Sequence, residues 1–275
     1  MSDRRRWPCN GRVAARRLEG QAEALRFVAP ERRSVGVPLA DLLTGPGGRR
    51  DRQVVFGEAL DLLEVRDGFA FVEALKDGYT GYVEESVLAG AVEPTHVVRA
   101  PSTHVYPERS IKVFERHWLT LGARVRVTAM DDSFAETPQG FIPRPHLAPV
   151  DAFERDPVAV AERLLGTPYL WGGNSRLGID CSGLVQVACV ACGIPCPGDS
   201  DMQERELGTA LPADAALRRG DLVFWKGHVA WVAGEDRILH ANGHDMAVAY
   251  EGLGAAIARI EAQGEGLPTG RRRLG

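Results

Sequence analysis

One cysteine in this chain stands where a helix should begin, a position that suits a nucleophile. Cys181 follows a run rich in turn-forming residues and precedes an apolar stretch that Gly193 ends, so the pattern predicts a helix starting at or just before the cysteine. Unpaired backbone N–H groups at a helix N-terminus carry partial positive charge, and we expect them to lower the pKa of a thiol there. A thiolate also needs a base and a group that orients the base.

Two histidines downstream are candidates for these two roles. Residues 227–232 and 237–242 read as apolar strands separated by a break at Gly234, which predicts an antiparallel pair that brings His228 and His240 together. One imidazole beside Cys181 would act as its base, and the other would fix the tautomer of the first. The alternative is that the cysteine is a small buried packing residue and that each histidine is structural.

The segment around these residues resembles a known family. From about residue 151 to 264 the chain resembles the NlpC/P60 cysteine peptidases, papain-like enzymes that cleave bacterial cell-wall peptides. The matching motifs, in order, are LGTPYLWGG (165–173), DCSGLVQ (180–186), RRGDLVFW (218–225), GHVAWV (227–232) and ILHANG (238–243). The resemblance implies that Cys181 is the nucleophile, His228 the general base and His240 the orienting third residue. It also implies that Tyr169 binds substrate or stabilises the oxyanion.

Short alternating strands divided by Gly and Asp turns fill the first half of the chain in two related copies. This pattern resembles bacterial SH3 domains, closely in the first copy and weakly in the second, where prolines interrupt the strands. The expected fold is α+β: a papain-like domain with helices packed on an antiparallel sheet, preceded by two small SH3-like β-barrels. The expected divisions are an N-terminal extension at 1–29, barrel 1 at 30–92, a divergent barrel 2 at 93–150 and the peptidase domain at 151–275.

Smaller features are also predicted from local pattern. Asp156 followed by Pro157 is a good helix start, and residues 251–263 have the apolar spacing of a helix that packs on the sheet. The first 28 residues read as a helix-prone lead-in. Residues 264–275 read as a loose tail or a final edge strand.

Two barrels before such a domain resemble one subgroup, the γ-D-glutamyl-L-diamino acid endopeptidases that process murein peptides. The resemblance implies that Asp199 and Ser200, with Ser182, bind the free amine of an N-terminal L-Ala. An aromatic residue of barrel 1 would close the pocket, and Tyr79 is the better candidate than Tyr82. The alternatives are that Ser200 and Gln203 form only a helix capping box and that both tyrosines serve only the barrel.

The expected function is therefore cleavage of the γ-D-Glu–diamino acid bond of murein stem peptides with a free N-terminal L-Ala, in cell-wall peptide recycling. A papain-like amidase or acyl transferase acting on another amide remains an alternative. A non-enzymatic wall-binding protein is a second rival, which the Cys181, His228 and His240 set argues against. The sequence leaves open diaminopimelate or lysine at the third substrate position, and it gives no oligomeric state.

Composition limits the binding partners, the cellular compartment and the metal sites that we expect. The 275 residues have a net charge of −4, which gives no reason to expect nucleic acid or an anionic membrane as partner. No apolar run follows the basic residues near the N-terminus, so we expect a cytoplasmic protein. Five cysteines, an odd number, fit a reducing compartment. Cys189, Cys192 and Cys196 lack a fourth ligand nearby in sequence, so we expect packing residues rather than zinc, with no metal and no cofactor.

Overall fold

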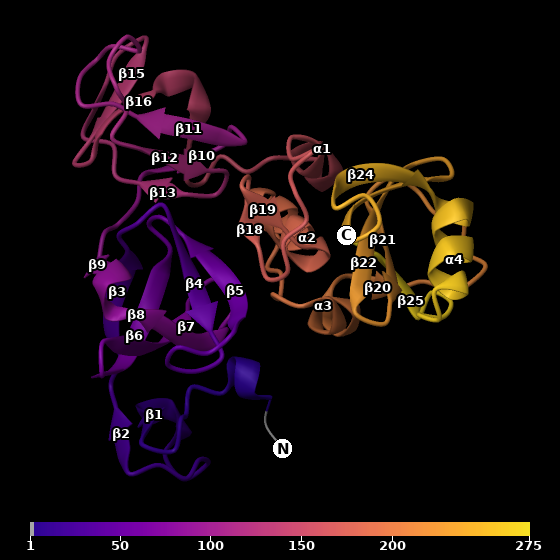
Figure 1. Ribbon diagram of the computed structural model, residues 1–275, viewed down its shortest axis with the longest axis horizontal. Helices are drawn as coiled ribbons and strands as arrows, with labels where there is room; N and C mark the ends of the chain where they lie inside the picture. Colours follow the sequence, from indigo (N-terminus) through magenta and orange to yellow (C-terminus); the bar gives the residue numbers. More distant parts are fainter. Residues whose placement is uncertain (1–2) are drawn as a thin grey trace. The chain divides into compact units, whose positions relative to one another are not determined.

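The computed structural model of this chain describes residues 3–275, which divide into two compact units with the boundary between residues 151 and 152 (Figure 1). Each unit is described by itself below. No helix among residues 3–275 has the length and apolarity needed to cross a bilayer.

The N-terminal segment of unit 1 is not helical, so the expectation of a helix-prone lead-in is wrong. It holds two single-turn 3₁₀ helices, η1 (Arg4–Arg6) and η2 (Arg16–Leu18), and two short parallel strands, β1 (Val13–Ala15) and β2 (Arg26–Val28). The reason is tertiary packing. The side chains of β1 are buried against Leu63 and Phe71 of the neighbouring sheet, and such long-range burial outweighs weak helical periodicity.

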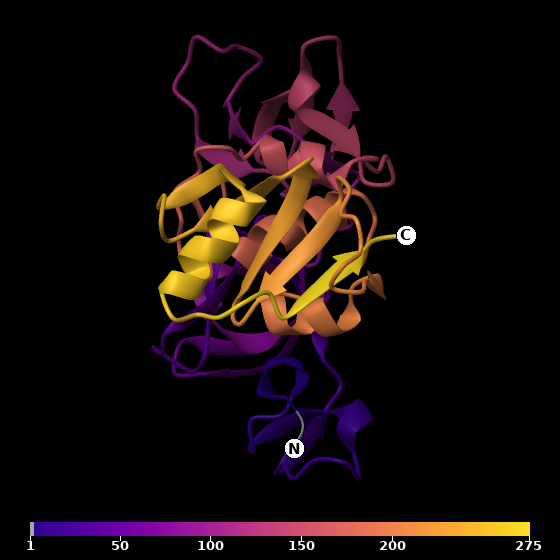
Figure 2. The same ribbon diagram turned by 90° about the vertical axis from the view of Figure 1, so that its right-hand side faces the viewer.

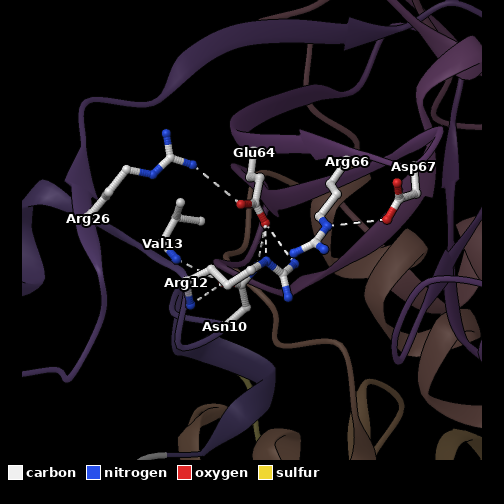
Figure 3. Close-up of polar contacts among 7 residues, drawn as sticks. All are labelled: Asn10, Arg12, Val13, Arg26, Glu64, Arg66 and Asp67. Atoms are coloured by element: carbon white, nitrogen blue, oxygen red, sulfur yellow. Dashed lines mark hydrogen bonds and ion pairs between the residues drawn. The ribbon is translucent and has the colours of Figure 1, made fainter.

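A carboxylate fastens this segment to the sheet (Figure 3). Glu64 accepts hydrogen bonds from Asn10 and from the guanidinium of Arg12, and it forms an ion pair with Arg26 at 3.4 Å. These contacts hold the pKa of Glu64 below its usual range, with the Arg12 hydrogen bond as the largest cause. The segment and the sheet together line a pocket of about 230 Å³.

A seven-stranded antiparallel sheet forms the first β-body, with its own apolar core. The strand order is β5-β4-β8-β7-β6-β3-β9, and β9 is reached through a single-turn helix, η3 (Glu85–Val87). The strands are β3 (Glu31–Val35), β4 (Leu39–Leu43), β5 (Arg50–Val55), β6 (Ala59–Arg66), β7 (Phe69–Ala74), β8 (Thr80–Glu84) and β9 (Leu88–Gly90).

The second β-body consists of three small sheets around a second core. Its strands are β10 (His96–Val98), β11 (Ser102–Val105), β12 (His117–Thr120), β13 (Arg124–Val125), β14 (Ala129–Met130), β15 (Phe134–Thr137), β16 (Gly140–Pro143) and β17 (Leu147–Pro149), with a 3₁₀ turn, η4 (Arg144–His146), before β17. The two bodies are joined, because Val55 and Phe56 pack into this second core. Gly57 has a φ of 75°, and a Cβ there would lie 2.0 Å from the carbonyl oxygen of Arg124, so only glycine allows the approach.

Unit 2 is built on a six-stranded antiparallel sheet in the order β20-β25-β21-β22-β23-β24 (Figure 2). Its strands are β20 (Thr209–Ala210), β21 (Asp221–Trp225), β22 (His228–Gly234), β23 (Arg237–Asn242), β24 (Ala247–Gly252) and β25 (Gly270–Arg273). A separate small hairpin joins β18 (Asn174–Ser175) and β19 (Gly178–Ile179). The helices are α1 (Pro157–Glu162), α2 (Cys181–Ala191), α3 (Ser200–Glu206) and α4 (Leu253–Ala262).

Helices lie on both sides of this sheet (Figure 1). Helix α4 buries Ala256 and Ile260 against Val223, Ala230 and Val232, whereas α1 and α2 contact β22 and β23 from the other side. Because both faces of β22 are covered, its residues are buried in succession rather than alternately. Strand β25 pairs with both β20 and β21, so part of residues 264–275 is an inner strand rather than a tail or an edge.

Candidate active site

Helix α2 begins at Cys181, as its sequence predicts, and Asp180 caps it. The Asp180 carboxylate accepts hydrogen bonds from the backbone N–H groups of Gly183 (2.6 Å) and Gly172 (2.9 Å). A Cβ on Gly183 would lie 2.6 Å from both the carbonyl oxygen of Gly173 and the side-chain oxygen of Asn174, so glycine is required where the helix meets this loop. The capping role of Asp180 was not among the predicted ones, although an Asp before an apolar helix is a standard N-cap signal.

The thiol of Cys181 lies against the backbone on either side of His228. Its Sγ is 4.0 Å from the carbonyl oxygen of Gly227, and the backbone N–H of Val229 also points to it. Burial raises the pKa of Cys181 to about 12, and the negative charge of Asp180 adds to this, while nearby N–H groups oppose it only in part. The expected lowering of this pKa is therefore wrong for the resting state, because desolvation outweighs the helix N-terminus.

The two histidines meet on neighbouring strands, as predicted. His228 begins β22, His240 lies on the antiparallel strand β23, and His228 Nε2 is 2.9 Å from His240 Nδ1. His240 is fully buried. Burial lowers the pKa of His228 to about 3 and that of His240 to about 4, so both rings are neutral near pH 7.

Tyr169 stands close to the same thiol. Its backbone N–H donates to the carbonyl oxygen of Met246, which anchors the loop to the start of β24. Burial raises the pKa of the Tyr169 hydroxyl, and the charges of Cys181 and Asp180 raise it further. The hydroxyl is thus a neutral hydrogen-bond donor near the Cys181 thiol, and the neutral form is the one that can stabilise an oxyanion.

Helix α3 brings the other predicted substrate residues beside the first turn of α2. Asp199 is the N-cap residue of α3 and is half-buried, and Ser200 begins the helix and is buried. The side-chain amide of Gln203 donates to the carbonyl oxygens of Ser182 and Pro197, each at 2.9 Å. Ser182 in turn donates from its hydroxyl to Asp180.

No capping box forms at α3. The Asp199 side chain makes no capping hydrogen bond, and Gln203 reaches across to α2 instead of back to its own helix start. Gln203 therefore connects the two helices. The spacing of Ser200 and Gln203 had suggested only a capping box within α3. Sequence spacing describes contacts within one helix and does not report a partner on another one.

Tyr79, the candidate from barrel 1, lies in unit 1 at the turn before β8. It is 2% exposed, belongs to the core cluster of the first β-body and has the guanidinium of Arg52 5.6 Å from its ring centre. Tyr82 is half-buried and stacks on Phe71 at 5.0 Å. The role of Tyr79 at a substrate pocket stays a prediction.

The remaining cysteines are not part of this arrangement. Cys189 and Cys196 are buried and interact with each other, and burial raises the pKa of Cys192 to about 11. Among residues 3–275, no group of three or more His, Cys, Asp or Glu side chains is placed to hold a metal ion.

Two family models match the chain. Residues 166–257 match the NlpC/P60 family, and residues 42–88 match the bacterial dipeptidyl-peptidase SH3 domain. The matched ranges contain the whole cysteine–histidine set and most of the first β-body, respectively.

Curated relatives and a solved structure agree with these matches. Dipeptidyl-peptidase 6 of Lysinibacillus sphaericus is 38% identical over 91 residues, which is 33% of each chain. The γ-D-glutamyl-L-lysine dipeptidyl-peptidase of Bacillus subtilis is 27% identical over 216 residues, 69% of this chain and 71% of that one. The chain thus spans a third of the first relative and about two thirds of the second.

The structural likeness extends further along the chain than these two sequence matches. The crystal structure of an NlpC/P60 family protein from Bacillus cereus matches with a TM-score of 0.74 over 89% of this chain and 99% of that one, at 20% identity. At this identity the likeness establishes the fold. The chain therefore contains an NlpC/P60 family domain preceded by a bacterial dipeptidyl-peptidase SH3 domain.

Proposed function

We propose that this protein is a cysteine peptidase that cleaves the γ-D-Glu–diamino acid bond of murein stem peptides bearing a free N-terminal L-Ala. The observation that carries the proposal is the 2.9 Å contact of His228 with His240, next to a cysteine at a helix N-terminus. The name of the Bacillus subtilis relative, a γ-D-glutamyl-L-lysine dipeptidyl-peptidase, supports the same kind of bond, and that of the Lysinibacillus relative supports a peptidase.

The reaction would begin with a neutral thiol and a neutral imidazole. With His228 Nε2 as donor in its 2.9 Å contact with His240 Nδ1, Nδ1 of His228 would be unprotonated and would take the proton of Cys181 as Sγ attacks the amide carbon. The backbone N–H of Cys181 and the hydroxyl of Tyr169 would stabilise the oxyanion. The imidazolium of His228 then protonates the leaving amine, and water hydrolyses the thioester with His228 again acting as base.

Asp199, Ser200 and Ser182 would bind the free ammonium group of the substrate. Support comes from Gln203, whose hydrogen bond to the carbonyl oxygen of Ser182 joins α3 to the first turn of α2, the turn that begins with Cys181. A half-buried carboxylate favours a cationic partner. Murein strands, whose stem peptide is acylated at that nitrogen, would be rejected.

The remaining parts of the proposal concern the fold of unit 1 and the compartment in which the protein acts. We propose that residues 93–150 are a second, divergent SH3-like barrel, which their small sheets and second core support. The burial of Tyr79 in the core of the first β-body favours the alternative in which this tyrosine serves only the barrel. We also propose a cytoplasmic role in recycling released peptides. The five free thiols of the chain support a reducing compartment.

Mass spectrometry of the products from L-Ala-γ-D-Glu-diaminopimelate tests the proposal, with the lysine peptide and both N-acetylated forms run beside it. We expect cleavage after D-Glu in the free-amine peptides only. Cleavage of the acetylated forms as well would support the peptidase activity but contradict the proposed requirement for a free N-terminal ammonium group. No cleavage of any of the four, with Cys181 still open to alkylation, would instead favour an amidase or acyl transferase acting on a different amide.

A further inference from the structure

A carboxylate stands behind the second histidine, on the side away from the first. His240 Nε2 lies 3.2 Å from Oε2 of Glu251 on β24, within ion-pair distance although the ring N–H is not aligned for a straight hydrogen bond. Glu251 is in turn held by Arg259 of α4, whose Nε and Nη2 donate to its two carboxylate oxygens at 2.9 and 2.7 Å. A line of contacts therefore runs from His228 through His240 and Glu251 to Arg259.

The contacts from His228 to Arg259 determine which nitrogen of each imidazole ring carries the proton. The hydrogen bond from Arg259 holds the pKa of Glu251 below its usual range, so Glu251 is ionised and can only accept. The ring nitrogen that faces it, His240 Nε2, must therefore carry the proton. A neutral His240 then has an unprotonated Nδ1, which accepts from His228 Nε2–H and leaves His228 Nδ1 unprotonated.

We infer that Glu251 is a positioning residue that sets the tautomer of His240 and, through it, the tautomer of His228 that can act as a base. The inference rests on the proposed peptidase reaction only for its consequence in catalysis, because the tautomers themselves are a property of the free protein. Glu251 touches no reacting atom.

Arg259 has a separate part in the same arrangement. A lone carboxylate beside buried His240 would favour the imidazolium, and a charged His240 could no longer accept from His228. The charged groups acting on His240 are Glu251 and Asp245, which raise its pKa, and Arg259, which lowers it together with burial. Because the positive charge of Arg259 offsets the negative charge of Glu251, the carboxylate can orient the imidazole of His240 while that ring stays neutral.

The ring nitrogens can be observed directly by NMR of protein labelled with [¹⁵N]histidine, with the His228 and His240 signals assigned by single substitution. In the wild type we expect both rings neutral at pH 7 and protonated at Nε2. Glu251→Gln should give mixed tautomers of His240, because an amide can donate as well as accept. Glu251→Asp, which keeps a carboxylate, should retain most of the wild-type pattern.

Glu162 offers a matched control in the same unit. It is also a carboxylate bound bidentately by an arginine, Arg219, and it contacts Tyr250 but no histidine. Glu162→Gln should leave the histidine spectrum unchanged. A wild-type spectrum with His240 protonated at Nδ1, or a Glu251→Gln spectrum identical to the wild type, would overturn the inference. The first result does not depend on whether Glu251→Gln folds.

Catalysis gives a second readout. With the peptide that the wild type cleaves, Glu251→Gln should lower kcat about ten- to a hundredfold with KM nearly unchanged, a loss typical of residues that orient a catalytic group. Equal kcat in Glu251→Gln and Glu162→Gln would contradict the inference. If the wild type cleaves no murein peptide, the proposed function fails, while the NMR result still decides the role of Glu251.

Discussion

Nε2 of His228 and Nδ1 of His240 lie 2.9 Å apart on the antiparallel strands β22 and β23. This contact occupies the ring nitrogen of His228 that is remote from its backbone and leaves Nδ1 as the one nitrogen available to a thiol. Cys181 meets the backbone at Gly227 and Val229, directly beside that histidine.

Replacing the nucleophile should separate activity from stability. Cys181→Ala should abolish peptide cleavage, because no other group can form the thioester, and should shift the thermal midpoint by less than about 3 °C, since only one small buried atom is lost. Cleavage assays and calorimetry measure the two effects. Cys192→Ala, a half-buried thiol near the other end of α2, is the control and should stay active. Residual activity in Cys181→Ala would remove it from the role of nucleophile.

The pH dependence of Cys181 alkylation tests whether Cys181 and His228 are both neutral in the resting protein. The pKa of Cys181 is raised to about 12 and that of His228 is lowered to about 3. Between these limits the thiol and the imidazole both stay neutral. If His228 takes the proton as Sγ attacks the reagent, the iodoacetamide rate follows this neutral pair and should be flat from about pH 5 to about pH 9.

His228→Ala provides the comparison for this profile. Without the imidazole only the hydroxide-dependent thiolate reacts, and because the pKa of the thiol is raised, its rate should increase about tenfold for each pH unit. A wild-type rate that already rises in this way would mean that Cys181 reacts without help from His228.

Asp199 should affect the binding of substrate rather than the chemical step. Asp199→Ala should raise KM for the free-amine peptide about tenfold or more with kcat largely kept, because it removes the charge proposed to hold the ammonium. The Asp199 side chain makes no capping bond to α3, so the helix should persist. Asp201→Ala, which removes a surface ion pair with Arg205, should leave KM unchanged. The same KM in both variants would exclude Asp199 from the site.

Gln203 should matter for stability as well as for binding. Gln203→Met keeps the size of the side chain but leaves the carbonyl oxygens of Ser182 and Pro197 without their donor. Leaving buried acceptors unpaired should lower the free energy of unfolding by about 2 kcal/mol. Urea denaturation followed by tryptophan fluorescence measures the loss. Gln21→Met, the same change on an exposed glutamine, should have almost no effect; an equal loss would contradict this role.

Several local features were predictable from sequence because their cause is local. Helix α2 begins at Cys181, with Asp180 as its cap, and α1 begins at Pro157 after the cap Asp156. Capping depends on residues a few positions apart, so the chain itself carries the signal. The pairing of the two histidine strands was also predictable, because short apolar runs divided by glycine favour antiparallel neighbours.

Other features depend on residues far apart in sequence. Residues 13–15 form a strand instead of a helix because Leu63 and Phe71 bury them, and residues 270–273 enter the sheet beside β21. Both segments have weak local preference, so the neighbours that the fold supplies decide their structure.

Local pattern was enough to predict the candidate residues: a cysteine at a helix start and two histidines on paired strands. Their protonation depends on the folded surroundings. Burial raises the pKa of Cys181 against the effect of its helix, and Glu251, which Arg259 holds, contacts His240 from the neighbouring strand, a contact that the sequence pattern does not indicate. Desolvation and charge–charge interaction depend on distance in space, and distance in sequence does not report it.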